Sequence, residues 1–281
     1  GVMLTHRNLV ANLCQMRHGE GMLREHDSVI GVLPFFHIYG MVVIMGAALV
    51  EGATIVSLPR FELEGFLRTL QDHRITYANI VPPILLALAK HPSVANYDLS
   101  ALHTLFSGAA PLGGELSSAV EARLGVRVRQ GYGLTETSPV THFHPLEGDI
   151  VIPSSVGPAV PNTTCRIVDP LTGQDVAAGE RGELYIHGPQ VMKGYFKKPE
   201  ATAACLSEDG WFRTGDIAVV DDHDLGRARH GLGHPRVPRQ LTIFAVDRHQ
   251  RLRPHQGEQR PQLLRAGMAR DVDRCDLLVQ N

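Results

Sequence analysis

Through residues 1–221, short apolar runs alternate with amphipathic stretches, and few folds accommodate that alternation. The runs that we expect to be strands are 28–32, 54–57, 77–80, 103–107 and 126–130. Between two of them, residues 62–73 place Leu63, Phe66, Leu67 and Leu70 on one helical stripe. Strands that alternate with helices are typical of a parallel sheet with helices on its faces. We therefore expect an α/β fold.

The pattern changes beyond about residue 156. β-like runs follow at 164–168, 182–187 and 217–220, and turn residues such as Asp169-Pro170-Leu171-Thr172-Gly173 separate them. This spacing predicts a smaller, mostly antiparallel β unit after the α/β portion. We therefore divide the chain into an α/β portion at 1–155 and a β unit at 156–221.

Residues 222–281 have a different composition from the rest of the chain. They contain 11 of the 23 arginines and no lysine, and histidine and glutamine accumulate among them. Such a segment usually stays solvated, because it has little apolar surface to bury. We interpret it as an aberrant tail, either disordered or translated out of frame. A nucleic-acid-binding arm is the alternative.

The overall charge excludes one class of partner. Lysine and arginine total 27 and aspartate and glutamate total 29, which gives a formal net charge of −2. The chain thus lacks the basic excess that favours nucleic acid or anionic membranes. We expect no nucleic-acid partner.

The cysteines and the apolar runs indicate the cellular compartment of the protein. Cys14, Cys165, Cys205 and Cys275 are widely separated and form no CxxC pair, as is typical of thiols in a reducing compartment. The most apolar run, 41–50, is shorter than the ~20 residues that cross a bilayer, and no signal peptide opens the sequence. We expect a soluble, cytoplasmic protein without a transmembrane segment. Because the first residue is not methionine, we also expect a segment of a longer protein.

Two glycine-containing loops follow expected strands, where open parallel sheets bind their ligands. The first is Ser107-Gly108-Ala109-Ala110-Pro111, which we expect to follow a strand and to open a helix at Pro111. Small residues allow a flat ring or a phosphate to approach the backbone, and a helix N-terminus favours negative charge. An ordinary βα turn would have the same appearance.

The second loop is Gln130-Gly131-Tyr132-Gly133-Leu134-Thr135-Glu136-Thr137. Its glycines permit tight backbone geometry around Tyr132, whose ring could stack on a base. Thr135 offers a hydroxyl to a phosphate, and Glu136 offers the hard oxygen that Mg²⁺ prefers. A plain turn would not require this combination.

Two further residues are candidates. Asp216, which we expect just before a strand, could accept hydrogen bonds from two ribose hydroxyls, although a turn cap is the simpler interpretation. His37 lies among aromatic residues at the end of a strand, where a single histidine is more often structural.

Several of these segments occur together in a fixed order. They are GVMLTHRNLVAN (1–12), LPFFHIYG (33–40), FSGAAPL (106–112), QGYGLTET (130–137), GELYIHGPQVMKGY (182–195) and GWFRTGD (210–216). In this order they resemble the adenylate-forming superfamily, in particular acyl-CoA synthetases of the 4-coumarate–CoA ligase and fatty-acid–CoA ligase type. The resemblance covers residues 1–221. It implies the central-to-C-terminal part of that family's large N-terminal domain, with doubly wound sheets and a small β-barrel-like unit.

The resemblance also implies a two-step reaction and a set of site residues. With Mg²⁺ bound, a carboxylate attacks the α-phosphorus of ATP and displaces pyrophosphate, which gives an acyl-adenylate. The thiol of coenzyme A then displaces AMP and forms a thioester. The implied catalytic residues are Thr135 at the α-phosphate, Glu136 as the metal ligand and His37 at the acyl and thiol tunnel. The implied nucleotide- and acyl-binding residues are Ser107, Gly108, Ala109, Ala110, Pro111, Gln130, Gly131, Tyr132, Gly133, Leu134 and Asp216. Among these, Tyr132 would pack on adenine and Asp216 would bind ribose.

The sequence also departs from the family. The phosphate loop would precede Gly1, and the Lys-rich hinge and mobile C-terminal domain with its catalytic lysine have no counterpart, since no lysine follows Lys198. We therefore expect the lid domain to be absent. The chain would then be an incomplete and inactive copy of an acid–thiol ligase.

Other functions stay open at this point. The chain could be a non-catalytic nucleotide- or acyl-binding pseudoenzyme, or another adenylate-forming enzyme such as an amino-acid-activating domain or a luciferase-like oxidoreductase. A nicotinamide-dependent enzyme is disfavoured, because no GxGxxG follows a strand. The identity of the acid and the oligomeric state cannot be derived from the sequence.

Overall fold

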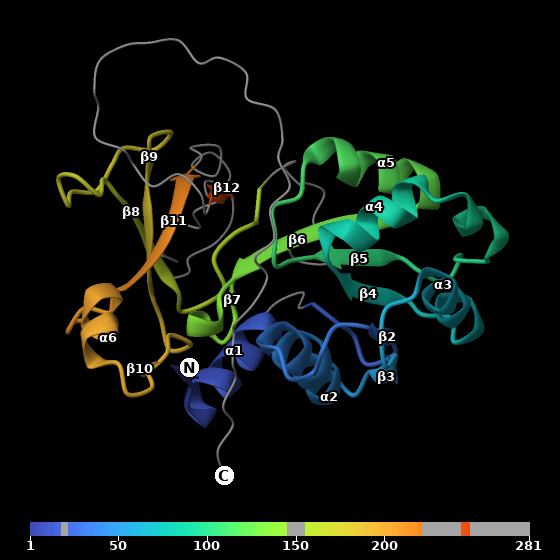
Figure 1. The fold of residues 1–281 in the computed structure, drawn as a ribbon, viewed down its shortest axis with the longest axis horizontal. Coiled ribbons are helices and arrows are strands. Elements are labelled where there is room, and N and C mark those ends of the chain that lie inside the picture. Colours follow the sequence, from blue (N-terminus) through green and yellow to red (C-terminus); the bar gives the residue numbers. More distant parts are fainter. Residues whose placement is uncertain (18–21, 145–154, 221–242, 248–281) are drawn as a thin grey trace, which may run out of the picture.

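A computed structural model describes residues 1–17, 22–144, 155–220 and 243–247, the last segment as backbone only. Within these residues the chain forms a six-stranded sheet, a four-stranded sheet and a two-stranded ribbon (Figure 1). The strands of the large sheet lie in the order β3-β2-β4-β5-β6-β7. Their bounds are β2 Ser28–Gly31, β3 Thr54–Ser57, β4 Tyr77–Ile80, β5 Thr104–Ser107, β6 Arg127–Gly133 and β7 Val140–Phe143.

Strands β3 to β6 of this sheet pair in parallel, and only β7 pairs antiparallel, with β6. Successive side chains of a strand face opposite sides of the sheet, so the strands of a sheet that is covered on both sides carry apolar residues toward both faces. Here one core contains Ile30, Ala78 and Leu105, and the other contains their neighbours Val29, Tyr77 and Phe106. The expected α/β fold is confirmed.

Helices cover both faces of the large sheet (Figure 1). The first core includes α3, α4 and α5, and the second includes α1, the π-helix η1 and α2. The helix bounds are α1 His6–Arg17, η1 Tyr39–Gly46, α2 Ala47–Glu51, α3 Leu63–Asp72, α4 Pro82–Lys90, η2 Pro92–Asn96, α5 Gly114–Leu124, η3 Thr135–Thr137 and α6 Pro199–Cys205.

The sequence explains where helix α3 begins and where helix α5 ends. The carboxylate of Glu62 caps α3 by accepting hydrogen bonds from the backbone N–H groups of Glu64 and Gly65. Helix α5 ends at Gly125, which adopts φ 69°, a left-handed conformation that glycine adopts without strain.

Two expectations about local structure are wrong. Helix α5 begins at Gly114 rather than at Pro111, and Gly113 is its N-cap. The segment 107–113 is therefore longer and less regular than an ordinary βα turn. Residues 130–133 belong to β6 and not to a loop, because pairing with β7 extends the strand to Gly133.

The four-stranded sheet has the order β12-β11-β9-β8 and is antiparallel throughout. Its strands are β8 Thr164–Val168, β9 Arg181–His187, β11 Phe212–Val220 and β12 Ile243–Asp247, and β1 Val2–Met3 and β10 Gly194–Tyr195 form the separate ribbon. Strand β11 begins before the expected residue 217 and contains Asp216, which the sequence pattern placed just ahead of a strand.

Of the proposed tail 222–281, only β12 lies within the described residues. The division of the chain at 155/156 and 221/222 stays a prediction.

No helix among the described residues is long and apolar enough to cross a membrane. Three cysteines fall in the described ranges, Cys14, Cys165 and Cys205, and all three are free thiols. Burial raises the pKa of Cys165 to about 12, so that thiol stays protonated and weakly reactive at neutral pH.

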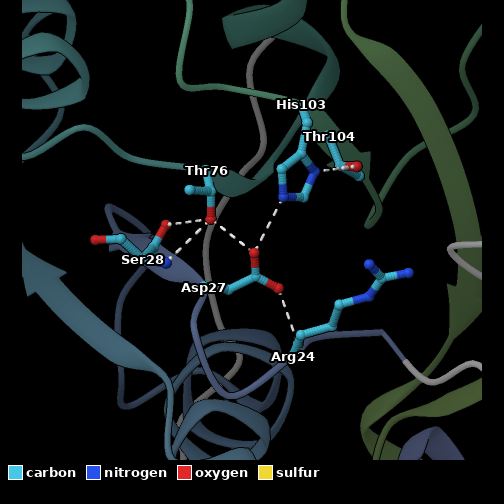
Figure 2. Close-up of polar contacts among 6 residues, drawn as sticks. All are labelled: Arg24, Asp27, Ser28, Thr76, His103 and Thr104. Atoms are coloured by element: carbon cyan, nitrogen blue, oxygen red, sulfur yellow. Dashed lines mark hydrogen bonds and ion pairs between the residues drawn. The ribbon is translucent and has the colours of Figure 1, made fainter.

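A polar cluster joins the amino ends of three parallel strands (Figure 2). Asp27 precedes β2, Thr76 precedes β4 and His103 precedes β5. The Asp27 carboxylate accepts from the Thr76 hydroxyl at 2.7 Å and lies 3.0 Å from His103 Nε2, and its second oxygen accepts from the Arg24 backbone N–H at 2.8 Å. Burial raises the pKa of Asp27, but these three hydrogen bonds outweigh it and hold the pKa below its ordinary value.

Replacement of Asp27 by Asn should destabilise the protein by about 2 kcal/mol near pH 7, because hydrogen bonds to a buried charge are lost. A carboxylate with a lowered folded-state pKa contributes stability above its unfolded pKa and loses it as the pH falls through the folded value. Urea unfolding at about pH 6 and about pH 3 should therefore show the difference from wild type shrinking at the lower pH.

The matched control is Asp72→Asn, since Asp72 is exposed at the end of α3 and accepts only from the neighbouring Gln71. It should leave the unfolding free energy unchanged at both pH values. An Asp27→Asn defect of equal size at both pH values would contradict the assigned role of the charge.

Candidate functional site

The carboxyl ends of the parallel strands bring the expected loops to one edge of the sheet. Ser107 at the end of β5 is in register with Ile80 of β4 on one side and with Gln130 of β6 on the other. Ser107 and Gln130 are buried, and within the described residues the Ser107 hydroxyl has no hydrogen-bond partner. The first two expected site segments therefore start from adjacent positions.

The segment after β5 is constrained close to the sheet and open beyond it. A Cβ atom on Gly108 would lie 3.2 Å from the ring of Tyr39, so any other residue would require that ring to shift by a few tenths of an ångström. Ala109 adopts φ 68°, a conformation that costs a non-glycine residue about 1 kcal/mol. Ala109, Ala110 and Pro111 are exposed. The backbone here is thus accessible to a ligand.

His37 lies at this same edge, after β2, but its described contacts are local. Its side chain is exposed, and its Nδ1 accepts from the backbone N–H of Tyr39 at the start of η1. Tyr39 is the better anchored residue, because its hydroxyl donates to the carbonyl of Phe106 at 3.1 Å and lies 3.4 Å from that of Ile80. Sequence reasoning singled out His37 and missed Tyr39, although both belong to the same aromatic segment.

The glycines of β6 are required by close packing. A Cβ atom on Gly131 would lie 2.6 Å from the Phe106 ring, and one on Gly133 would lie 2.1 Å from the Pro139 carbonyl oxygen. Both distances are shorter than any stable contact. Gly131 therefore leaves room for the Phe106 ring of β5, and Gly133 allows the segment before β7 to fold back against β6.

Tyr132 and Asp216 meet in the structure although 84 positions separate them. The Tyr132 hydroxyl donates to the Asp216 carboxylate at 2.6 Å, and the two residues are 9% and 3% exposed. His142 of β7 pairs with Tyr132 of β6 and is buried. Burial lowers the pKa of His142 to about 3, so its side chain is neutral at pH 7. The base- and ribose-binding candidates thus form one contact between the two sheets.

Glu136 lies one turn further along, in η3. Its Oε1 accepts from the Tyr195 hydroxyl at 2.8 Å, and its backbone carbonyl accepts from Met192. Burial and the neighbouring carboxylate raise the pKa of Tyr195, so its hydroxyl remains a donor. The neighbouring Thr135 is half-buried. Tyr195 was part of a motif in the sequence, but its contact with Glu136 could not be read from spacing.

A cavity of about 340 Å³ lies beside Glu136. Its lining includes Leu134 and Glu136, Glu183, Thr214 and Gly215 of the four-stranded sheet, and Ala204 and Cys205 of α6. Its size falls within the range of small-molecule sites. Glu136 could hold a hard cation here, although the described residues contain no group of three or more metal-ligating side chains. The described contacts do not join His37 to this cavity.

Comparison with known proteins identifies the family. A family model described as AMP-binding enzyme matches residues 1–196. This chain belongs to the AMP-binding enzyme family. Its curated relatives include 4-coumarate–CoA ligase 1 of Solanum tuberosum, which is 42% identical over 231 residues, or 80% of this chain and 42% of the relative. A probable 4-coumarate–CoA ligase 1 of Dictyostelium discoideum is 41% identical over 225 residues, or 79% and 40%.

The chain spans about two fifths of the length of these curated relatives. Among solved structures, ATP-bound MatB from Rhodopseudomonas palustris matches with a TM-score of 0.74 and 30% identity, covering 86% of this chain and 44% of that one. The N-terminal domain of FACL13 from Mycobacterium tuberculosis matches with a TM-score of 0.73 and 24% identity, covering 88% and 57%. The expected fold class is therefore confirmed.

The contact between Tyr132 and Asp216 generates a prediction. Tyr132→Phe should destabilise the chain by roughly 1–2 kcal/mol, because a buried carboxylate oxygen loses its donor while the ring keeps its packing. Chemical denaturation would measure the change.

Tyr185→Phe is the control, since Tyr185 is likewise a strand tyrosine, in β9, but has a half-exposed side chain. We expect it to cost much less. Equal losses for the two variants would show that the Tyr132 hydroxyl has no special stabilising role.

Proposed function

We propose that this chain carries the adenylate-binding part of an ATP-dependent carboxylic acid–CoA ligase. The observation that carries the proposal is the common cavity of about 340 Å³ that borders both Glu136 and the Thr214–Gly215 step before Asp216. Membership of the AMP-binding enzyme family and the similarity to 4-coumarate–CoA ligases and to ATP-bound MatB support it.

In this proposal Tyr132 and Asp216 hold the nucleoside. An aromatic ring offers a face to adenine, and a carboxylate accepts hydrogen bonds from ribose hydroxyls. Their mutual hydrogen bond at 2.6 Å supports the pairing, because it keeps the two groups at a fixed separation before a ligand arrives. Gln130, Gly131, Gly133 and Leu134 complete the wall around them.

The phosphates and Mg²⁺ are assigned to the η3 side of the cavity. Mg²⁺ prefers hard oxygen ligands and is usually held by one or two carboxylates together with phosphate oxygens, so the single carboxylate of Glu136 fits. Tyr195 donates to only one of its oxygens, Oε1. Thr135, the first residue of η3, would donate its hydroxyl to the α-phosphate. The metal would neutralise charge on the phosphates during displacement.

The carboxylic acid and the thiol of coenzyme A are assigned to the edge formed by segment 107–111 and His37. The accessible backbone of Ala109 and Ala110 and the unpartnered hydroxyl of Ser107 support this assignment. The small and apolar residues favour an aromatic or aliphatic acid over an amino acid, which would need a partner for its ammonium group.

We propose that these residues bind AMP and the acyl-adenylate. In the ligase reaction the protein contributes mainly positioning and charge stabilisation.

Calorimetry with AMP, and with ATP in the presence and absence of Mg²⁺, tests the proposal. AMP should bind without metal, and Mg²⁺ should strengthen ATP binding. Glu136→Gln should weaken Mg²⁺·ATP binding about tenfold, roughly 1.4 kcal/mol, and leave AMP binding unchanged, because only the metal ligand is altered.

The matched control is Glu208→Gln, an exposed glutamate just before β11, which should change neither affinity. Absence of AMP binding by the wild-type chain would contradict the proposed function.

A further inference from the structure

Strand β11 carries a large irregularity opposite β9. Phe212 and Arg213 pair with Ile186 and Tyr185, and the pairing then resumes at Ile217 with Glu183. Residues 214–216 of β11 therefore lie opposite the single residue Leu184 of β9. This bulge carries Asp216, which is the proposed ribose ligand, at its far end.

The bulge is held by specific hydrogen bonds. The Thr214 hydroxyl donates to the Leu184 carbonyl at 2.8 Å and accepts from the Asp216 backbone N–H at 3.1 Å. Gly215 has φ 75°, so the backbone here takes a conformation that favours glycine. Its N–H donates to Oε1 of Glu183 at 3.1 Å.

Glu183 binds the middle of this bulge and the residue before it. Besides Gly215, its second carboxylate oxygen accepts from Arg213 Nη2 at 3.2 Å. The side chain is 10% exposed, and the next residue on β9, Leu184, is fully buried. A buried carboxylate is costly unless donors satisfy it. Here the donors come from the residue just before Asp216 and the residue just before the bulge.

We propose that Glu183 is a positioning residue for nucleotide binding, which it promotes by fixing the bulge that presents Asp216. The inference rests on the proposed function. Glu183 makes no hydrogen bond to Asp216 in the structure and acts through the Gly215 backbone. Its effect should therefore depend on the ribose hydroxyls that Asp216 would bind.

The experiment measures dissociation constants of the full chain for AMP and for 2′,3′-dideoxy-AMP by calorimetry. Glu183→Gln keeps the size of the side chain but places an amide donor or a neutral oxygen against Arg213 and Gly215. It should weaken AMP binding about tenfold and change dideoxy-AMP binding less than twofold. A purely structural loss would weaken both ligands equally and would overturn the inference.

A double-mutant cycle sharpens the test. If Glu183 acts through Asp216, the Glu183→Gln/Asp216→Asn variant should bind AMP no more weakly than Asp216→Asn alone. Additive losses would overturn the inference. Glu180→Gln is the matched control, because Glu180 is an exposed glutamate three positions away whose one hydrogen bond within the described residues is from the Ala177 backbone.

Two outcomes separate this inference from the proposed function. If the wild-type chain binds no AMP, the proposed function fails. If AMP binds and Asp216→Asn weakens its binding while Glu183→Gln does not, only the inference fails.

If the Glu183→Gln variant does not fold, Arg213→Gln provides a second test, because it removes one of the two donors to Glu183. It should weaken AMP binding two- to fivefold and leave dideoxy-AMP binding unchanged. Equal effects on the two ligands would again overturn the inference.

Discussion

Three amide side chains of α1 hold the two sheets in one arrangement. Asn8, Asn12 and Gln15 are spaced four and three residues apart, so they share one helix face. Asn12 accepts from and donates to the backbone of Val140 in β7, while Asn8 donates to the carbonyls of Pro189 and Val191. Asn12 is completely buried, so loss of any of these bonds would leave polar groups unpaired in the core.

The candidate site depends on this arrangement because its residues come from both sheets. The segment 189–191 that Asn8 binds leads directly to Met192, whose N–H donates to the Glu136 carbonyl, and on to Tyr195, which contacts the Glu136 carboxylate. The pairing of β1 with β10 holds the same segment from its far end. The opening residues of the sequence thus contribute to the metal-binding candidate although none of them lines the cavity.

Local patterns predicted much of the fold and less of the site. The four residues of β4 are all buried, and α3 has a pronounced apolar stripe. The composition of β4 and the helical periodicity of α3 were therefore sufficient to predict both elements. The end of β6 could not be predicted, because only its pairing with β7 makes residues 131–133 a strand. The contacts of Tyr39, Tyr195 and Glu183 depend on distant partners, which a pattern along the chain does not reveal.

Buried carboxylates serve different purposes at different places in this fold. Asp27 receives three hydrogen bonds at the amino ends of β2, β4 and β5, away from the cavity, and there it joins neighbouring strands. Glu183 receives two hydrogen bonds beside the cavity and stabilises an interruption of a strand. A regular β11 would need neither Gly215 in a left-handed conformation nor a charge near the core. Since both features raise the cost of folding, the bulge is best understood as the means by which a short antiparallel sheet directs Asp216 toward Tyr132.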